Sequence, residues 1–190
     1  MTGLRRLSHA ISEGQGISVL VEVRDAESAR AAETQGAEGL VVRGAAADLR
    51  DATQLPILVY GIAADASVDA VVIEVTDVDE DELGAAVDRA AGSGLECVLK
   101  VRDEEELEHV LETLDPEILL LSADRAADGD TPLERLLDLL PDVPAGKLAI
   151  AELPRPSRDD VAELERAGID AVLVGAGDVA GLVDEPPPEV

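Results

Sequence analysis

Short aliphatic runs alternate with polar, helix-forming segments along the whole chain. The clearest unit is Ser157–Gly177, where a capped helical pattern leads through a glycine turn into an apolar run and a glycine-containing loop. Runs that are apolar at nearly every position are typical of strands buried on both faces of a parallel sheet. The pattern predicts eight strands, at Ser18–Val23, Gly39–Arg43, Pro56–Tyr60, Ala70–Val75, Glu96–Val101, Ile118–Leu121, Leu148–Glu152 and Ala171–Val174.

Helical segments separate most of these strands. Apolar residues spaced by three and four positions mark the helices, and Asp103, Thr131 and Ser157 are typical N-caps. The predicted helices cover Leu4–Ile11, Ala26–Thr34, Ala45–Ala52 (weakly), Glu80–Ala91, the segments after Asp103, Thr131 and Ser157, and a segment opened by Gly175 and Gly177. The connection after the third strand is too short for a full helix. Eight strands that alternate with helices favour an α/β fold, a compact (β/α)8 TIM barrel, over a doubly wound open sheet.

The chain length fits a single domain of this kind. We expect an N-terminal helix and lead-in at residues 1–17, the barrel at residues 18–183, and a disordered acidic and proline-containing tail at residues 184–190. No apolar run reaches the length of a membrane span, and the N-terminal segment lacks the continuous apolar stretch of a signal peptide. We therefore expect a cytoplasmic protein. The single cysteine, Cys97, excludes an internal disulfide.

The charge balance is extreme. Aspartate and glutamate number 42 against 15 lysines and arginines, which gives a formal net charge of −27. Such a surface repels nucleic acid and anionic membranes, so neither is an expected partner. It also repels itself, and concentrated salt shortens the range of that repulsion. The composition indicates a halophilic protein, or alternatively an acidic protein from a GC-rich genome. The leucine-rich helices are compatible with a homodimer.

The scarce basic residues gather at one end of the predicted barrel. Only Lys147 lies in a loop before a strand, whereas six lie at strand ends or in the loops after them: Arg24, Arg43, Lys100, Arg102, Arg125 and Arg155. Because barrels of this type bind ligands at the carboxyl ends of their strands, this asymmetry predicts a small anionic metabolite there. The alternative is that these charges only pair with strand-end carboxylates.

We assign candidate site residues on this basis. The candidate catalytic residues are Glu22, Arg24, Lys100 and Glu152, and the candidate ligand-binding residues are Arg43, Tyr60, Arg102 and Ser122. The N–H groups of Gly175 and Gly177 are candidates for holding a phosphate. A lysine inside an apolar barrel has a depressed pKa and could form a Schiff base or act as a general acid; the alternative is an ordinary ion-pair partner. No residue spacing predicts a metal site, and we expect no cofactor.

Four segments carry a resemblance to a known family. They are Leu20–Arg24, Leu55–Leu58, Val98–Leu111 and Arg158–Gly175, within a region of about Val19–Leu182. With these segments the chain resembles the indole-3-glycerol-phosphate synthases, a family of ribulose-phosphate-binding barrels. The resemblance implies a TIM barrel and an enzyme that decarboxylates and cyclises an anthranilate-derived ribulose phosphate to form an indole ring.

The resemblance also implies roles for particular positions. Glu22 and Glu152 match the family's glutamates on strands one and seven. Arg24 stands at a strand-one lysine, Tyr60 at the strand-three lysine that acts as general acid, and Lys100 at a strand-five glutamate. Ser122 falls near an asparagine after strand six. A serine and a glycine after strand seven are replaced, in this sequence, by Leu153 and Pro154.

Three hypotheses follow from these replacements. In the first, the chain is a diverged barrel that binds or converts a small anionic, phosphorylated metabolite, with Arg24, Lys100 and Arg102 as its cations and Glu22 or Glu152 transferring protons; as an enzyme it would be a lyase or isomerase. In the second, it is a catalytically inactive barrel with a structural or regulatory role. In the third, it is a genuine synthase with a rebuilt site.

The net charge generates a prediction about salt. In molar salt the Debye length falls to about 3 Å, so the carboxylates stop repelling one another across the surface. We expect the melting temperature, followed by circular dichroism, to rise steeply between 0.1 M and 3 M KCl, with loss of the fold at the lowest salt. A melting temperature that does not change over this range would contradict the halophilic interpretation.

Overall fold

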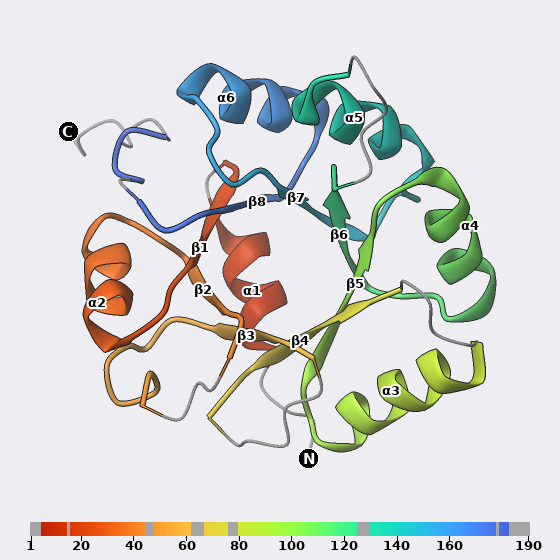
Figure 1. Cartoon of the computed structure of the whole chain (residues 1–190), viewed down its shortest axis with the longest axis horizontal. Helices are drawn as coiled ribbons and strands as arrows, with labels where there is room; N and C mark the ends of the chain where they lie inside the picture. The colour runs from red at the N-terminus through yellow and green to blue at the C-terminus, as the bar shows by residue number, and fades with distance from the viewer. Residues whose placement is uncertain are drawn as a thin grey trace.

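The eight predicted strands close into one parallel barrel in a computed structural model of the chain, which describes residues 5–14, 16–44, 48–61, 67–75, 80–124, 130–177 and 179–182. Each strand pairs with its neighbours in sequence, and β8 pairs with β1 (Figure 1). The (β/α)8 TIM barrel prediction is therefore confirmed. The strands are β1 Ser18–Glu22, β2 Gly39–Val42, β3 Ile57–Tyr60, β4 Ala70–Glu74, β5 Glu96–Val101, β6 Ile118–Ser122, β7 Leu148–Glu152 and β8 Ala171–Val174.

Helices surround the barrel. The helices are α1 Arg6–Glu13, α2 Ala26–Thr34, α3 Glu80–Gly92, α4 Glu104–Thr113, α5 Pro132–Leu139 with the 3-10 turn Leu140–Asp142, and α6 Arg158–Ala167. The side chains of Asp103, Thr131 and Ser157 accept hydrogen bonds from the amides three residues ahead, which confirms the predicted caps. Within the described residues, no helix has the length and apolar character needed to cross a membrane.

Aliphatic residues fill both sides of the sheet. Side chains that alternate along each strand point outward to the helices or inward to the barrel axis. The inward set forms a separate cluster that includes Leu20, Leu58, Val98 and Ile150 from odd-numbered strands. Val41, Val72, Leu120 and Leu173 come from the even-numbered strands and complete the filling. The interior is therefore packed solid, so ligand chemistry is confined to the ends of the barrel.

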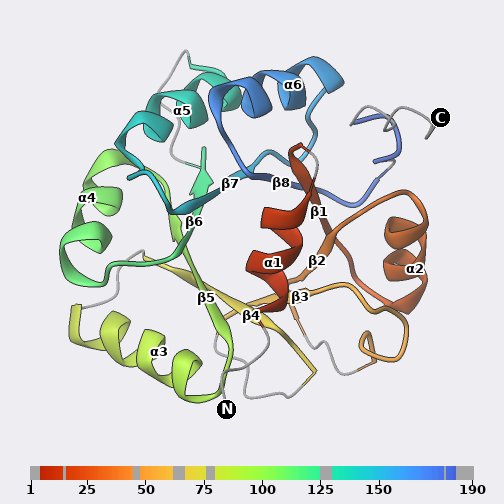
Figure 2. The same ribbon diagram turned by 180° about the vertical axis from the view of Figure 1, so that it is seen from behind.

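Helix α1 closes the end of the barrel at which the strands begin (Figure 2). Leu7 and Ile11 are buried in the interior cluster. The first residue of β5, Glu96, accepts hydrogen bonds from the backbone N–H groups of Leu7 and Ser8 at 2.7 and 3.1 Å. A carboxylate at a helix N-terminus stabilises the helix dipole and satisfies free amides. The opposite end, where the strands finish, is left for polar side chains.

The structure departs from two helix predictions. Residues 48–52 form turns, and residues 45–47 lie outside the described part. Leu49 is the one fully buried side chain of that stretch, which is too little apolar surface to hold a helix in place. After β8, the described residues 179–182 form a turn in place of the predicted helix, because Gly177 and Gly181 have low helix propensity.

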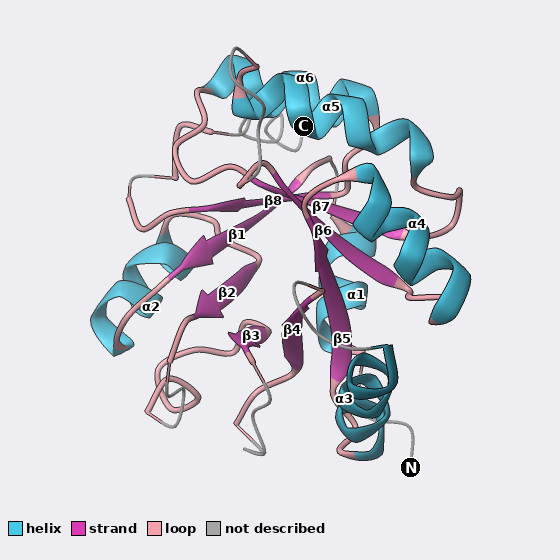
Figure 3. Ribbon diagram, turned by 45° about the vertical axis from the view of Figure 1, so that its right-hand side comes forward, coloured by secondary structure: helices cyan, strands magenta, loops and turns pink. Residues whose placement is uncertain are grey.

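The shell of helices is thinner beside β3 and β4. In the described residues of the two connections that flank β3, no helix is present (Figure 3). This agrees with the short connection expected after the third strand. The expected tail at residues 184–190 lies outside the described residues.

Candidate functional site

A layer of polar side chains caps the interior at the carboxyl ends of the strands. Glu22, Tyr60, Lys100 and Glu152 occupy the inward positions above the last aliphatic layer, one from each odd-numbered strand. This is the layer arrangement that strand tilt imposes on an eight-stranded barrel. The strand register places Glu74 beside Lys100 and Ser122 beside Glu152.

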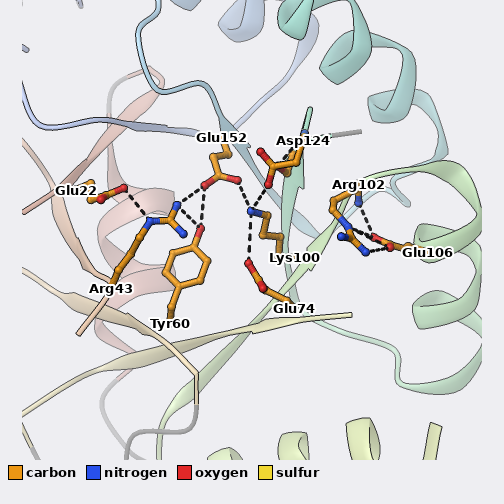
Figure 4. Close-up of polar contacts among 10 residues, drawn as sticks. Glu22, Arg43, Tyr60, Glu74, Lys100, Arg102, Glu106, Asp124 and Glu152 are labelled. Atoms are coloured by element: carbon orange, nitrogen blue, oxygen red, sulfur yellow. Dashed lines mark hydrogen bonds and ion pairs between the residues drawn. The ribbon is translucent and has the colours of Figure 1, made fainter. Parts of the chain in front are cut away.

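Glu152 lies at the centre of the layer and is 6% exposed. Its Oε1 accepts hydrogen bonds from Arg43 Nη2 at 2.8 Å and from the Tyr60 hydroxyl at 2.9 Å. Its Oε2 lies 2.8 Å from Lys100 Nζ (Figure 4). Burial raises the pKa of Glu152, but the hydrogen bond and charge of Lys100 outweigh burial and hold that pKa below its ordinary value. The carboxylate is therefore ionised.

Lys100 is the most enclosed cation of the site, at 3% exposure. Its Nζ lies 2.7 Å from Asp124 Oδ2, 2.8 Å from Glu152 Oε2 and 3.6 Å from Glu74 Oε1. Burial lowers the pKa of Lys100, yet the hydrogen bonds to Asp124 and Glu152 overcome burial and raise that pKa above its ordinary value. The expectation of a depressed pKa is therefore wrong, and Lys100 is the ion-pair partner of the alternative interpretation.

Arg43 and Tyr60 form the other half of the network. Arg43 Nε lies 3.0 Å from Glu22 Oε2, and its guanidinium lies 4.1 Å from the centre of the Tyr60 ring, a cation–π distance. Burial and the neighbouring Glu152 charge raise the pKa of Tyr60, so its hydroxyl keeps its proton. One ring face of the chain's single aromatic residue is thus covered by Arg43.

Two predicted residues do not join this network. Arg24 is exposed just beyond β1, and its backbone N–H donates to Ser28 Oγ at the start of α2. Arg102 pairs with Glu106 on α4, away from the central cluster (Figure 4). Arg125 lies outside the described residues. Arg102 pairs with Glu106 because Glu106 lies in the first turn of α4, within reach of the end of β5.

The predicted phosphate-binding turn is partly engaged by the chain itself. The backbone N–H of Gly175 donates to the Pro154 carbonyl at 2.8 Å. A β-carbon at Gly175 would lie 2.8 Å from the same oxygen, so the two loops are in close backbone contact. Pro154 has no N–H to offer. Gly177 faces open space, and its role in binding phosphate stays a prediction.

Asp124 is a member of the network that the sequence analysis did not select. It lies two residues beyond the end of β6, so Leu120, Ser122 and Asp124 share a face by the period of two. That spacing was the available signal. Lys100 holds the pKa of Asp124 below its ordinary value, and the carboxylate is 62% exposed.

Carboxylates outnumber cations in the layer. Glu22, Glu74, Asp124 and Glu152 surround Arg43 and Lys100. Among the described residues, no group of histidines, cysteines or carboxylates has the arrangement of a metal site. The layer holds ionised carboxylates, a protonated lysine and a protonated tyrosine, so it can bind charged groups, but none of the shifted groups gains or loses a proton readily near neutral pH.

Solved structures similar to this one share its barrel. The thiamine phosphate pyrophosphorylase from Pyrococcus furiosus aligns with a TM-score of 0.67 and 20% identity over 87% of this chain and 93% of that chain. The N-acetylmannosamine-6-phosphate 2-epimerase from Clostridium perfringens aligns with a TM-score of 0.69 and 15% identity, over 85% of this chain and 87% of that one. Identities this low show the fold alone.

Sequence comparison identifies a family. The family model described as indole-3-glycerol phosphate synthase matches residues 59–179. The protein named indole-3-glycerol phosphate synthase in Geobacillus sp. (strain WCH70) is 30% identical over 166 residues, which are 77% of this chain and 64% of that protein. The one in Pelodictyon phaeoclathratiforme is 36% identical over 109 residues, 57% of this chain and 42% of that protein. The matches thus span about two fifths to two thirds of these relatives' length. Sequence and barrel together place this chain in the indole-3-glycerol phosphate synthase family.

Proposed function

We propose that this barrel binds a small anionic metabolite at the carboxyl ends of its strands and does not catalyse the ring closure that the family resemblance implies. The observation that carries the proposal is Lys100, a buried and protonated lysine inside the barrel mouth. Arg43 supplies a second cation on the other side of Glu152, with 45% of its side chain exposed.

The partners of Lys100 are of two kinds. Glu152 is buried with it, whereas Glu74 and Asp124 are 51% and 62% exposed. Water can solvate the carboxylate of Glu74 or Asp124 when it leaves Lys100, because more than half of each of these side chains is already exposed. A ligand anion can therefore replace an exposed carboxylate on Lys100 at small cost while Glu152 stays in place.

Two replacements argue against the parent reaction. The resemblance assigns a general-acid lysine to strand three and a glutamate to strand five, where this chain has Tyr60 and Lys100. A proton donor or acceptor works best when its pKa is near the operating pH. The pKa of each of these two side chains is raised above its ordinary value, which is already near 10. Neither group can exchange a proton efficiently at neutral pH.

The binding proposal is tested by changing one lysine at a time. The chain has only two, Lys100 in the mouth and Lys147, which lies before β7 and pairs with Asp115. We expect inorganic phosphate, ribose 5-phosphate or acetate to raise the melting temperature at constant ionic strength. At a ligand concentration of 100 times Kd, the free energy of unfolding should rise by about 2.7 kcal/mol. Lys100→Met should abolish the shift, and the control Lys147→Met should keep it.

Lys100→Met leaves Glu152 buried without its lysine, which commonly destabilises a protein by about 3–5 kcal/mol. The double variant Lys100→Met, Glu152→Gln removes both buried charges and serves if the single variant does not fold. An unchanged ligand shift in either variant would overturn the assignment of Lys100. No shift of the wild-type protein with any of the anions would favour the catalytically inactive structural or regulatory barrel.

The second prediction concerns catalysis. With the anthranilate-derived ribulose phosphate as substrate, we expect no indole fluorescence above a no-enzyme control, while the Geobacillus relative serves as positive control. The variant Tyr60→Lys, Lys100→Glu restores the residue types that the resemblance assigns, and it should show more turnover than the wild type. Wild-type turnover that is lost in Glu152→Gln would support a genuine synthase with a rebuilt site instead.

A further inference from the structure

We propose that the anion taken at this mouth is a small aliphatic carboxylate, seated on Lys100 in the place that Asp124 occupies. This inference rests on the proposed function and narrows its ligand class. A carboxylate is a different ligand from the phosphate that Gly175 and Gly177 after β8 first suggested.

Two positions of the loops after β7 and β8 are not available as phosphate donors. Phosphate sites at barrel mouths use several free backbone N–H groups. Here the Gly175 N–H is bonded to the Pro154 carbonyl, and Pro154 itself has no N–H. The β-carbon position of Gly175 is 2.8 Å from that carbonyl oxygen, so no group fits between the two loops at this point.

Lys100 already holds a carboxylate in a position that a ligand could take. Asp124 Oδ2 lies 2.7 Å from Nζ, a charge-assisted hydrogen bond, although the aspartate side chain is 62% exposed. Asp124 approaches from just beyond β6, on the solvent side of a lysine that is itself buried. A free carboxylate that replaced Asp124 would make the same contact with the same geometry.

The charge of the layer favours a single negative charge. Four carboxylates surround two cations, so the layer carries an excess of negative charge before any ligand arrives. Exchange of the Asp124 carboxylate for a ligand carboxylate keeps a single carboxylate in that position on Lys100, while the displaced Asp124 side chain is solvated. A phosphate dianion would add a further negative charge close to Glu74 and Glu152, and like charges at this range repel.

The surroundings of Tyr60 indicate whether the ligand is aliphatic or aromatic. The chain contains no phenylalanine or tryptophan, and Arg43 covers one face of the single tyrosine ring. Lys100 Nζ also lies 5.7 Å from the centre of that ring. Recognition of an aromatic ligand normally uses open aromatic surface for stacking. The mouth is therefore suited to an aliphatic carboxylate that is read by charge and hydrogen bonds.

Isothermal titration calorimetry measures the affinity for acetate, glycolate and inorganic phosphate at one ionic strength and tests the inference. We expect the two carboxylates to bind more tightly than phosphate, and Lys100→Met to abolish their binding. Asp124→Asn keeps the size of the side chain and removes its charge, so the internal competitor is weakened. Acetate affinity should then rise about tenfold, a change of about 1.4 kcal/mol.

The chain offers a matched control in Asp115→Asn, because Asp115 also pairs with a lysine but lies before β6, away from the mouth. It should leave acetate affinity unchanged. Phosphate binding that is tighter than carboxylate binding would overturn this inference and leave the proposed function standing. If Asp124→Asn and the wild type bind acetate with equal affinity, the proposed binding position on Lys100 is overturned. No binding of any of the three anions would overturn the proposed function itself.

Discussion

The polar end of the barrel depends on the buried ion pair between Lys100 and Glu152. Each side chain is almost fully enclosed, and a buried charge is stable only when it is paired and hydrogen-bonded. The pair meets that condition through side chains from across the barrel mouth: the hydroxyl of Tyr60 at the end of β3, the guanidinium of Arg43 just beyond β2 and the carboxylate of Asp124 beyond β6. The same contacts hold the pKa of Glu152 and Asp124 below, and that of Lys100 above, their ordinary values.

The two ends of the barrel are closed by opposite means. At the end where the strands begin, α1 inserts Leu7 and Ile11 into the aliphatic interior and is capped by Glu96. At the other end, charged residues replace aliphatic ones in the top layer. The first end buries apolar side chains, and the second is the end at which we propose that a ligand binds. Membership of the indole-3-glycerol phosphate synthase family and the chemistry of this mouth are separate matters, because a shared barrel does not by itself carry a shared activity.

Local rules predicted much of the fold and part of the site. The bounds of β5, β7 and β8 follow from aliphatic runs. The period of two along each strand correctly predicted that Glu22, Lys100 and Glu152 point into the mouth. The pairing across strands was not predictable in the same way. Whether the pKa of Lys100 falls or rises depends on a balance between burial and partners, and its partner Asp124 lies beyond a strand end. The engagement of Gly175 by Pro154 likewise depends on how two loops meet.

We infer that Lys100 is an ion-pair partner that stays charged at neutral pH, and not a nucleophile. The chain has only two lysines, so protein labelled with ¹³C at the lysine ε-carbon gives two NMR signals that Lys147→Met assigns. Titration of the folded protein toward high pH then reads the pKa of Lys100 directly. We expect a value above the ordinary 10.5, so that the stabilisation by this pair is fully present below pH 10.5 and is lost as the pH rises through the raised pKa of the folded protein. A Lys100 signal that titrates below 10.5 would show a depressed pKa and overturn the assignment of Lys100 as an ion-pair partner.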